Sequence, residues 1–335
     1  MNTDPVLVEV VRGGFVESRH RGSVAVVNAR GQVVLSVGDP ARLIYPRSAT
    51  KPIQALQLIE SGVADSWRLS AADLSLVQSS HGGEPVHVQR IQVWINRLGI
   101  GVDNLICGAH WPTNEAAARA LVHDGRVPSR AHNNCSGKHC GFLTTARQLG
   151  ETMDDYGDRD HPVQRRWRDA LAELGDHPLD AAPEGIDGCG IPVFAMPLQA
   201  LALAFARIAD PSREAAVRQA AMRRLADAVW QAPHMIAGEG RLCSAIASRA
   251  PGRVLAKVGA EGVYAAALPA LGLGVALKVE DGAVRAAETA LVAVLARLGA
   301  LDAADLEALA PWGRRGVTTW AGAEVGTIRP ADALI

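Results

Sequence analysis

The chain has 335 residues, of which 48% are hydrophobic and 21% are charged, a composition typical of a globular protein with a large core. The formal net charge is -1 and the arginines are scattered, which argues against nucleic acid or an anionic membrane as a partner and favours a small molecule. The longest uncharged run, residues 191–206, is short for a membrane span and contains two prolines, so a buried helix is expected there.

The N-terminal region lacks the pattern of a secretory signal peptide. Asp4, Glu9 and Arg12 interrupt its first apolar run, and a cytoplasmic protein is therefore expected. The five cysteines are an odd number, which favours free thiols or metal ligands over a framework of disulfides. Of these, Cys107 and Cys243 are expected to be core residues.

Strand and helix patterns alternate along the chain in three blocks. Runs rich in β-branched residues predict strands at residues 6–11, 23–28 and 32–37. Periodic apolar faces then predict helices at residues 86–98, 116–122, 141–149, 163–174 and 215–230. Strand patterns return at residues 254–258, 263–268 and 274–279, followed by a helix at 284–298.

This order predicts an α/β (α+β) fold. Because an isolated hairpin is only marginally stable, the N-terminal and C-terminal strands are expected to complete one antiparallel sheet flanked by helices. Residues 1–65 and 240–335 would form the part that contains the sheet, and residues 66–239 a mainly helical insertion. The active site is expected between these two parts.

A serine and a lysine stand three residues apart at an expected helix start. Positions i and i+3 share one face of a helix, so the Lys51 amine could reach the Ser48 hydroxyl and act as its base. Pro52 then falls in the first turn, where its missing N–H costs little. Alternatively, Ser48 or Thr50 is only the N-cap of this helix, and the spacing alone favours that ordinary interpretation.

Two further stretches carry side chains suited to catalysis. Residues 78–84 form a compact polar turn that contains Ser80 and two glycines, in which side chains and backbone amides could meet a ligand. Ser80 could equally be a helix cap. Lys257 stands at the expected end of a strand, where it could contact a substrate or, more commonly, be solvated at a sheet edge.

Two cysteines occupy dense polar stretches. Cys135 is expected at the positive end of a helix, which favours its thiolate, and Cys189 stands on a tight glycine turn. With Lys138 or His139 these thiols could hold zinc. Their long separation has none of the Cys-x-x-Cys spacing of a strong zinc motif, so spacing alone favours two reduced structural thiols.

Taken together, five motifs resemble the Rhizobium etli type of L-asparaginase, and the match runs nearly end to end. They are Ser48-Ala49-Thr50-Lys51-Pro52, Ser79-Ser80-His81-Gly82-Gly83-Glu84, Asn134-Cys135-Ser136-Gly137-Lys138-His139, Asp187-Gly188-Cys189-Gly190 and Lys257-Val258-Gly259-Ala260-Glu261-Gly262. The resemblance implies a fold similar to serine β-lactamases and glutaminases, a homodimer, and hydrolysis of L-asparagine to L-aspartate and ammonia.

The resemblance also implies roles for single residues. It gives Ser48 with Lys51 as nucleophile and base, and Ser80 with Lys257 as a second Ser-Lys pair in the same pocket. Ser48 would attack the side-chain amide carbon, and water would hydrolyse the acyl-enzyme. Three residues are expected to hold the α-amino and α-carboxylate groups of the substrate: Arg47, His139 and Asp187.

One zinc ion per chain is implied as well. Cys135, Lys138 and Cys189 match the zinc ligands of the family, with water as the fourth ligand. Because a serine already supplies the nucleophile, we expect this ion to support substrate binding rather than the nucleophilic step. Only the neutral amine of a lysine has a lone pair to donate, so zinc binding should weaken as the pH falls.

Three other functions fit parts of the pattern. A penicillin-binding or β-lactamase activity would share the Ser-x-x-Lys spacing, but the chain lacks the Ser-Asp-Asn and Lys-Thr-Gly motifs. A glutaminase or related amidase differs by one methylene group in its substrate, which changes binding only modestly. A zinc-stabilised protein that binds an amino acid without turnover would need the same pocket but no activated serine.

Overall fold

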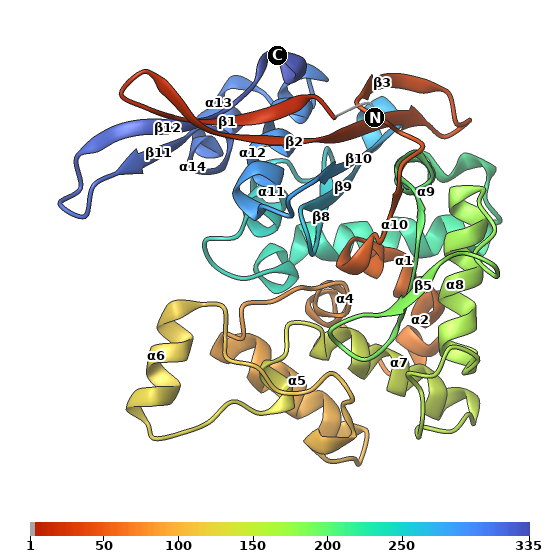
Figure 1. Cartoon of the computed structure of the whole chain (residues 1–335). Coiled ribbons are helices and arrows are strands. Elements are labelled where there is room, and N and C mark those ends of the chain that lie inside the picture. Colours follow the sequence, from red (N-terminus) through yellow and green to blue (C-terminus); the bar gives the residue numbers. More distant parts are fainter. Residues whose placement is uncertain (1–3) are drawn as a thin grey trace.

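The first and last strands of the chain lie side by side in one eight-stranded antiparallel sheet (Figure 1). The computed structural model describes residues 4–335. The main strand order is β11-β12-β1-β2-β10-β9-β8, and β3 pairs with β2. The bounds are β1 Val6–Arg12, β2 Phe15–Asn28, β3 Val33–Val37, β8 Leu255–Gly259, β9 Val263–Leu268, β10 Leu273–Val279, β11 Arg315–Thr318 and β12 Glu324–Pro330. The prediction of one sheet built from both ends of the chain is therefore confirmed.

The long strand β2 joins the two halves of this sheet. Its first half exposes alternate residues and pairs with β1, whereas its second half is buried and pairs with β10. The change of partner falls at Gly22, where a Cβ atom would lie 2.2 Å from the carbonyl oxygen of Lys278. Glycine is required there because the neighbouring strand leaves no room for a side chain.

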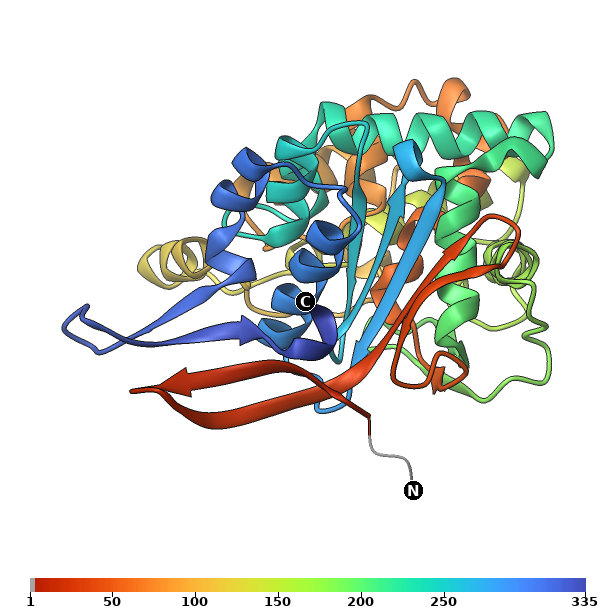
Figure 2. The same cartoon turned by 90° about the horizontal axis from the view of Figure 1, so that it is seen from above.

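The hairpin β11–β12 was not predicted from the sequence. In β11 only Val317 is partly buried, so no apolar face marks the strand. Pairing with β1 stabilises the hairpin instead, with Val8 opposite Pro330. Figure 2 shows this hairpin and the tip of the β1–β2 hairpin extending together beyond the helices.

All the helices predicted from apolar periodicity are present, with ends shifted by a few residues. The longer helices are α4 Ala71–Val77, α5 Pro85–Arg97, α6 Glu115–His123, α7 Ser136–Leu149, α8 Pro162–Gly175, α9 Leu198–Ala209, α10 Ala216–Gln231, α11 Leu242–Arg249 and α12 Val284–Arg297. Two short helices follow, α13 Ala303–Ala308 and α14 Ala310–Gly313.

The uncharged run at 191–206 is helical only in its second part. Its beginning forms the short strands β6 (Pro192–Phe194) and β7 (Met196–Pro197), and α9 starts directly afterwards. Pro197 has φ -57° and ψ 142°, an extended conformation outside the helix. The expectation of a buried helix over the whole run was therefore wrong for residues 191–197, nearly half of it.

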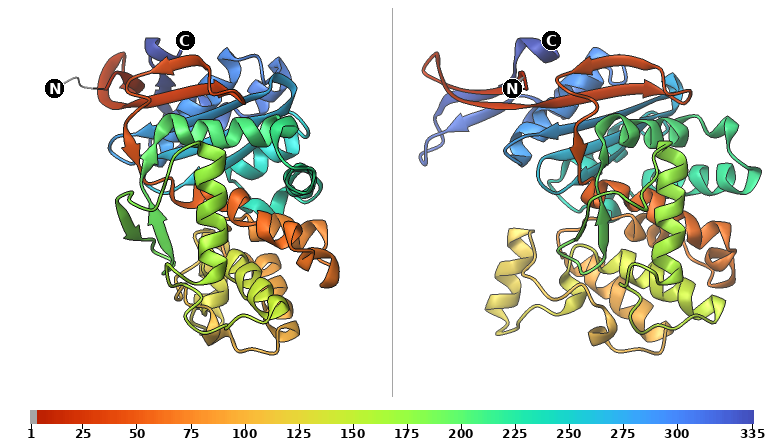
Figure 3. Two further views of the ribbon diagram at one scale, coloured as in Figure 1. Left: turned by 90° about the vertical axis from the view of Figure 1, so that its right-hand side faces the viewer. Right: turned by 45° about the vertical axis from the view of Figure 1, so that its right-hand side comes forward.

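Helix α9 packs across β2 and β10 and positions the helical region against the sheet. At the contact, a Cβ atom on Gly274 would lie 2.0 Å from the carbonyl oxygen of Ala202. The absent side chain lets the helix backbone touch the strand. Helices α4 to α7 lie farther from the sheet, as both views of Figure 3 show. The division into two parts at residues 65 and 240 stays a prediction.

Across residues 4–335, no helix combines the length and the apolar character needed to cross a membrane.

Candidate active site

The Ser48 stretch starts as a 3-10 turn rather than as the regular helix expected. The turn η1 covers Arg47–Thr50 and leads into α1 (Lys51–Gln54) and α2 (Leu56–Glu60). Neither hydroxyl caps a helix: Ser48 lies inside the turn, and the Thr50 Oγ1 atom donates to the Arg47 carbonyl at 3.0 Å. Thr50 therefore occupies the N-cap position of α1 without a side-chain capping bond, and the N-cap interpretation of Ser48 is wrong.

Lys51 points toward Ser80 and not toward Ser48, three residues before it in the sequence. The buried Nζ atom donates to the Ser80 Oγ atom at 3.1 Å, to the Asn134 carbonyl at 3.5 Å and to the Ser79 carbonyl. Three acceptors match the three N–H bonds of an ammonium group. Within residues 4–335, no hydrogen bond joins Lys51 to the Ser48 hydroxyl.

A second lysine reaches the same oxygen. Lys257 lies within β8 and is fully buried, so the expectation of a solvated lysine at a sheet edge was wrong. Its Nζ atom lies 2.8 Å from the Ser80 Oγ atom and 3.0 Å from the Val258 carbonyl oxygen. Burial, together with the positive charge of Lys51, lowers the pKa of Lys257 well below its ordinary value. Lys257 therefore loses its proton more readily than an ordinary lysine, beside the Ser80 hydroxyl.

Backbone hydrogen bonds fix Ser80 between two other segments. The Ser80 amide donates to the Ile236 carbonyl at 3.0 Å, and the Gly82 amide donates to the Ala237 carbonyl at 2.9 Å. The next residue, His81, is buried, and its Nε2 atom lies 2.9 Å from the Ser136 Oγ atom. Ser80 therefore does not cap a helix, and the turn at 78–84 is a rigid internal segment.

The three predicted zinc ligands converge at the start of α7. Cys135 is the N-cap of this helix, and the Lys138 Nζ atom donates to the Cys189 Sγ atom at 2.8 Å. A hydrogen bond from Cys189 lowers the pKa of Cys135 well below its ordinary value, against the opposing effect of burial. Burial alone would lower the pKa of Lys138, but the two neighbouring thiols have the larger, opposite effect, so this pKa is raised. Two sulfurs and an amine around one point form a donor set that fits zinc.

Arg47 and Asp187 form a bidentate ion pair. The Arg47 Nε and Nη2 atoms donate to the two carboxylate oxygens of Asp187 at 3.2 and 3.1 Å. Burial raises the pKa of Asp187, but the Arg47 hydrogen bonds and the charge of Lys138 outweigh burial and lower it. Arg47 has a φ of +52°, a left-handed conformation that non-glycine residues seldom adopt and that commonly marks a functional site.

A narrow cavity contains part of this set. Its lining includes the predicted residues Arg47, Ser48, Lys51, Lys138 and Asp187, together with the side chains of Trp167, Leu171 and Phe194. Ser80 and Lys257 lie behind Lys51 and, in the described part of the chain, do not reach this lining.

His139 also lies outside the cavity. The ring is fully buried, and its Nδ1 atom lies 2.8 Å from the hydroxyl oxygen of Tyr156. Burial lowers the pKa of His139 well below its ordinary value, so the ring is neutral. No feature of the sequence singled out Tyr156, which lies 17 residues farther along the chain.

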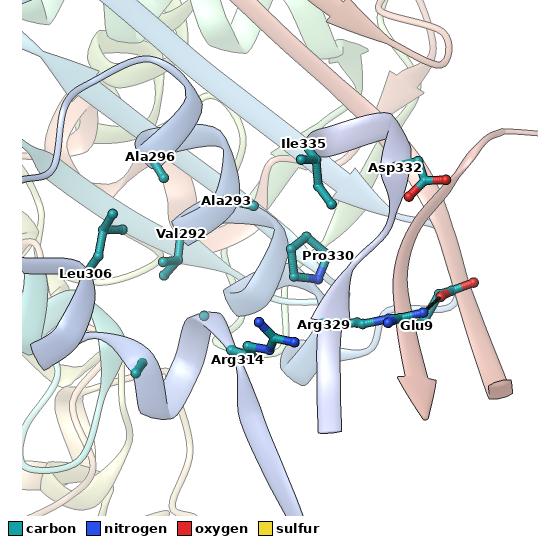
Figure 4. A pocket seen from close by; sticks show the side chains of 12 residues that line it. Glu9, Val292, Ala293, Ala296, Leu306, Arg314, Arg329, Pro330, Asp332 and Ile335 are labelled. Carbon is teal, nitrogen blue, oxygen red and sulfur yellow. Dashed lines mark hydrogen bonds and ion pairs between the residues drawn. The ribbon is translucent and has the colours of Figure 1, made fainter. Parts of the chain in front are cut away.

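A larger cavity of about 600 Å³ lies elsewhere, between α12, α14 and the end of β12 (Figure 4). Its lining is mainly small and apolar, as at Val292, Ala293 and Ala296, with the ion pair of Glu9 and Arg329 at its rim. None of the predicted site residues lines it. It offers no nucleophile beside a base, so the Ser48 cavity is the catalytic candidate.

The fold is of mixed α/β architecture, and Ser48 lies with Lys51 and Lys138 along one narrow cavity. The sequence matches the family model described as L-asparaginase II over residues 8–330. The chain therefore belongs to the L-asparaginase II family.

Other comparisons gave weaker similarities. No curated protein sequence matches the chain. The solved structure of Mglu in its native form has a TM-score of 0.46 and 14% identity, covering 85% of this chain and 66% of that one. This chain thus spans slightly less than two thirds of the length of Mglu. A β-lactamase from Mycobacterium bovis has a TM-score of 0.42 and 18% identity, covering 82% of this chain and 94% of that one. Similarities of this size say nothing about what the chain cleaves.

Proposed function

We propose that the protein hydrolyses L-asparagine to L-aspartate and ammonia, with Ser48 as the nucleophile. The observation that carries this proposal is the buried row of Lys51, Ser80 and Lys257 next to a cavity that Ser48 lines. Of the two serines, only Ser48 is exposed to this cavity. Ser80, which is 5% exposed and lies behind Lys51, is placed to pass a proton rather than to attack a substrate.

The row provides a path for one proton. In the proposed resting state Lys51, which contacts three acceptors, holds it as an ammonium group, and Lys257, whose pKa burial lowers, is neutral. When Ser80 accepts a proton from Lys51 and gives its own to Lys257, the charge moves away and Lys51 gains a lone pair beside the cavity. Lys51 then takes the proton of Ser48 as Oγ attacks the amide carbon.

The same proton completes the reaction. Lys51 gives it to the amide nitrogen, the C–N bond breaks, and ammonia leaves an acyl-enzyme on Ser48. A water molecule then attacks the ester carbon and transfers a proton to Lys51. Lys51 passes this proton to Ser48 as the ester bond breaks, and the new carboxylic acid of the product loses its proton to ammonia. Lys257 then returns its proton through Ser80 to Lys51, so the enzyme is back in its starting state.

Charged residues at the cavity fit the ends of an amino acid. The Arg47 guanidinium suits an α-carboxylate, and the Asp187 carboxylate suits an α-ammonium group, since both line the cavity with Ser48. The predicted role of His139 in substrate binding has no such support from its position behind the cavity. It stays a prediction.

The zinc ion is part of the proposal. Cys135, Lys138 and Cys189 would hold one ion per chain, and a bound ion would supply a fixed positive charge close to the substrate-binding groups. Lys138 lines the cavity, so the site adjoins the place where the substrate would bind. A homodimer is proposed from the family resemblance alone, and the cytoplasmic location stays a prediction.

Ammonia release tests the proposal. Purified protein is assayed with L-asparagine and, separately, with L-glutamine, and Ser48→Ala is compared with the control Ser61→Ala at the exposed end of α2. We expect release from asparagine, its loss in Ser48→Ala and no change in Ser61→Ala. Binding of asparagine without ammonia would support an amino-acid-binding protein instead, and faster release from glutamine would support a glutaminase.

A further inference from the structure

Three side chains of types that can bind a metal ion meet at the contact between α5 and the 3-10 turn η5 (Pro233–Ile236). The Nε2 atom of His234 lies 2.8 Å from the Oε2 atom of Glu84, the residue before α5. One ring nitrogen of His87 joins them, so that three potential ligand atoms lie within 4.8 Å of one another. The proposed reaction uses none of these residues, and the cluster shares none with the thiol site.

The ring of His87 is fully buried but not fully paired. Its Nε2 atom lies 3.2 Å from the His234 carbonyl oxygen, so the N–H of this ring is used there and the lone pair is left on Nδ1. Nδ1 is buried and has no hydrogen-bond partner within residues 4–335. Burial lowers the pKa of His87, which keeps the ring neutral, as a metal ligand must be. An imidazole held by a backbone carbonyl is the usual orientation of a histidine ligand.

The backbone leaves room for the carboxylate of Glu84. Its Oε1 atom accepts a hydrogen bond from the Glu239 amide at 2.9 Å. A Cβ atom on Gly238 would lie 1.9 Å from this oxygen, and Gly238 has a φ of +103° that side chains rarely allow. The loop after η5 is therefore shaped around the Glu84 carboxylate.

From this geometry we propose that Glu84, His87 and His234 bind one divalent transition-metal cation, such as Zn²⁺ or Co²⁺. Two imidazoles and one carboxylate are a common ligand set for ions of this class. The rings of His87 and His234 are stacked, with centroids 5.3 Å apart, so one ring must turn for both to bind a single ion. The His234 side chain is 46% exposed, which permits that turn and gives the cation a route in.

A bound cation would link two segments that hold the catalytic region. Glu84 ends the segment that carries Ser80, and His234 begins the segment whose Ile236 carbonyl accepts from the Ser80 amide. The ion would therefore tie the start of α5 to η5 and stabilise the folded chain. It lies outside the cavity that Ser48 lines, so its role is structural.

Cobalt absorption separates this site from the thiol site. Full-length Cys189→Ser protein, freed of metal with a chelator, is titrated with Co²⁺, because only a thiolate-bound ion gives a sulfur-to-cobalt charge-transfer band. We expect about one bound Co²⁺ with ligand-field bands and no sulfur band. Adding His234→Gln should weaken this binding at least about tenfold, whereas adding His123→Gln, at an exposed histidine on α6, should not.

Thermal unfolding gives a second readout. Zn²⁺ should raise the melting temperature of Cys189→Ser and of its His123→Gln derivative, but not of its His234→Gln derivative. In protein that keeps Cys189, the total amount of bound Co²⁺ should exceed the amount that the sulfur charge-transfer band accounts for. Absence of Co²⁺ binding in Cys189→Ser, or unchanged affinity after His234→Gln, would overturn the proposal. Neither result depends on ammonia release.

Discussion

The Nζ atom of Lys257 lies 2.8 Å from the Oγ atom of Ser80, across 177 positions of sequence. Lys51 reaches the same oxygen from the other side at 3.1 Å. One hydroxyl thus bridges two amines, and burial together with the charge of Lys51 lowers the pKa of Lys257.

Ser80→Ala should break the proton path without removing the nucleophile. The two amines would lose the oxygen that connects them, so Lys51 would keep its proton and could not activate Ser48. We expect kcat for asparagine hydrolysis to fall by about 10²–10⁴, the usual contribution of general acid–base catalysis, with little change in KM. Steady-state ammonia assays measure both constants. A Ser80→Ala enzyme with normal kcat would show that the path does not run through this hydroxyl.

Local sequence patterns predicted much of the fold. Apolar periodicity was sufficient for α5 and α8 because each buries one face against the core. The strand β11 was not predicted because almost none of its residues are buried, so no apolar pattern marks it. Its stability comes from pairing with β12, which no local pattern encodes.

The site was harder to predict from spacing. The i, i+3 rule suggested that Lys51 reaches Ser48, but the chain enters α1 through a 3-10 turn and the amine finds three acceptors elsewhere. Those acceptors lie between 28 and 83 residues away in sequence. Only the family resemblance paired Ser80 with Lys257, and it could not show that Lys51 joins them.

Asp187→Asn should impair substrate binding. Its carboxylate is ionised, because the Arg47 hydrogen bonds and the Lys138 charge lower its pKa despite burial. The neutral amide would no longer attract an α-ammonium group by its charge. It would also break the bidentate ion pair that holds Arg47. We expect KM for asparagine to rise about tenfold or more, with a smaller change in kcat. Asp160→Asn, at an exposed carboxylate paired with Arg159, is the matched control and should leave both constants unchanged.

Zinc at the thiol site should depend on Cys189 and on pH. In cobalt-substituted protein the sulfur charge-transfer band should disappear in Cys189→Ser and persist in Cys243→Ser, since Cys243 is a buried core thiol as expected from the sequence. The two thiols raise the pKa of Lys138 in the metal-free protein, so a proton competes for its lone pair. Affinity should therefore fall as the pH is lowered, as competition with a chelator would measure.

Loss of this metal should affect binding more than chemistry. Removal of zinc is expected to raise KM for asparagine more than it lowers kcat, because the proposed nucleophile needs no metal-bound water. A sulfur band that survives Cys189→Ser would contradict the ligand assignment. A fall in kcat alone would instead give the ion a part in the chemical step.

The pH dependence of activity should report the lowered pKa of Lys257. This amine must be neutral to accept a proton from Ser80, and below its pKa in the folded protein it is already protonated. Activity should therefore rise with pH through a titration well below the ordinary lysine pKa of about 10.4. Lys257→Met removes the acceptor, so kcat should fall by about 10²–10⁴ and the rising limb should shift.

The matched control is Lys278→Met, at a lysine on strand β10, which β9 separates from β8, and which does not line the cavity. It should keep the wild-type pH profile. Stability provides an independent check, because the unfolded chain protonates Lys257 at pH values where the folded chain does not. In the window between the lowered and the ordinary pKa, the free energy of unfolding should therefore rise with pH in wild type, and less so in Lys257→Met. If Lys257→Met raised KM alone and left the pH profile intact, Lys257 would serve substrate binding and the proton of Ser48 would pass to Lys51 without the second amine.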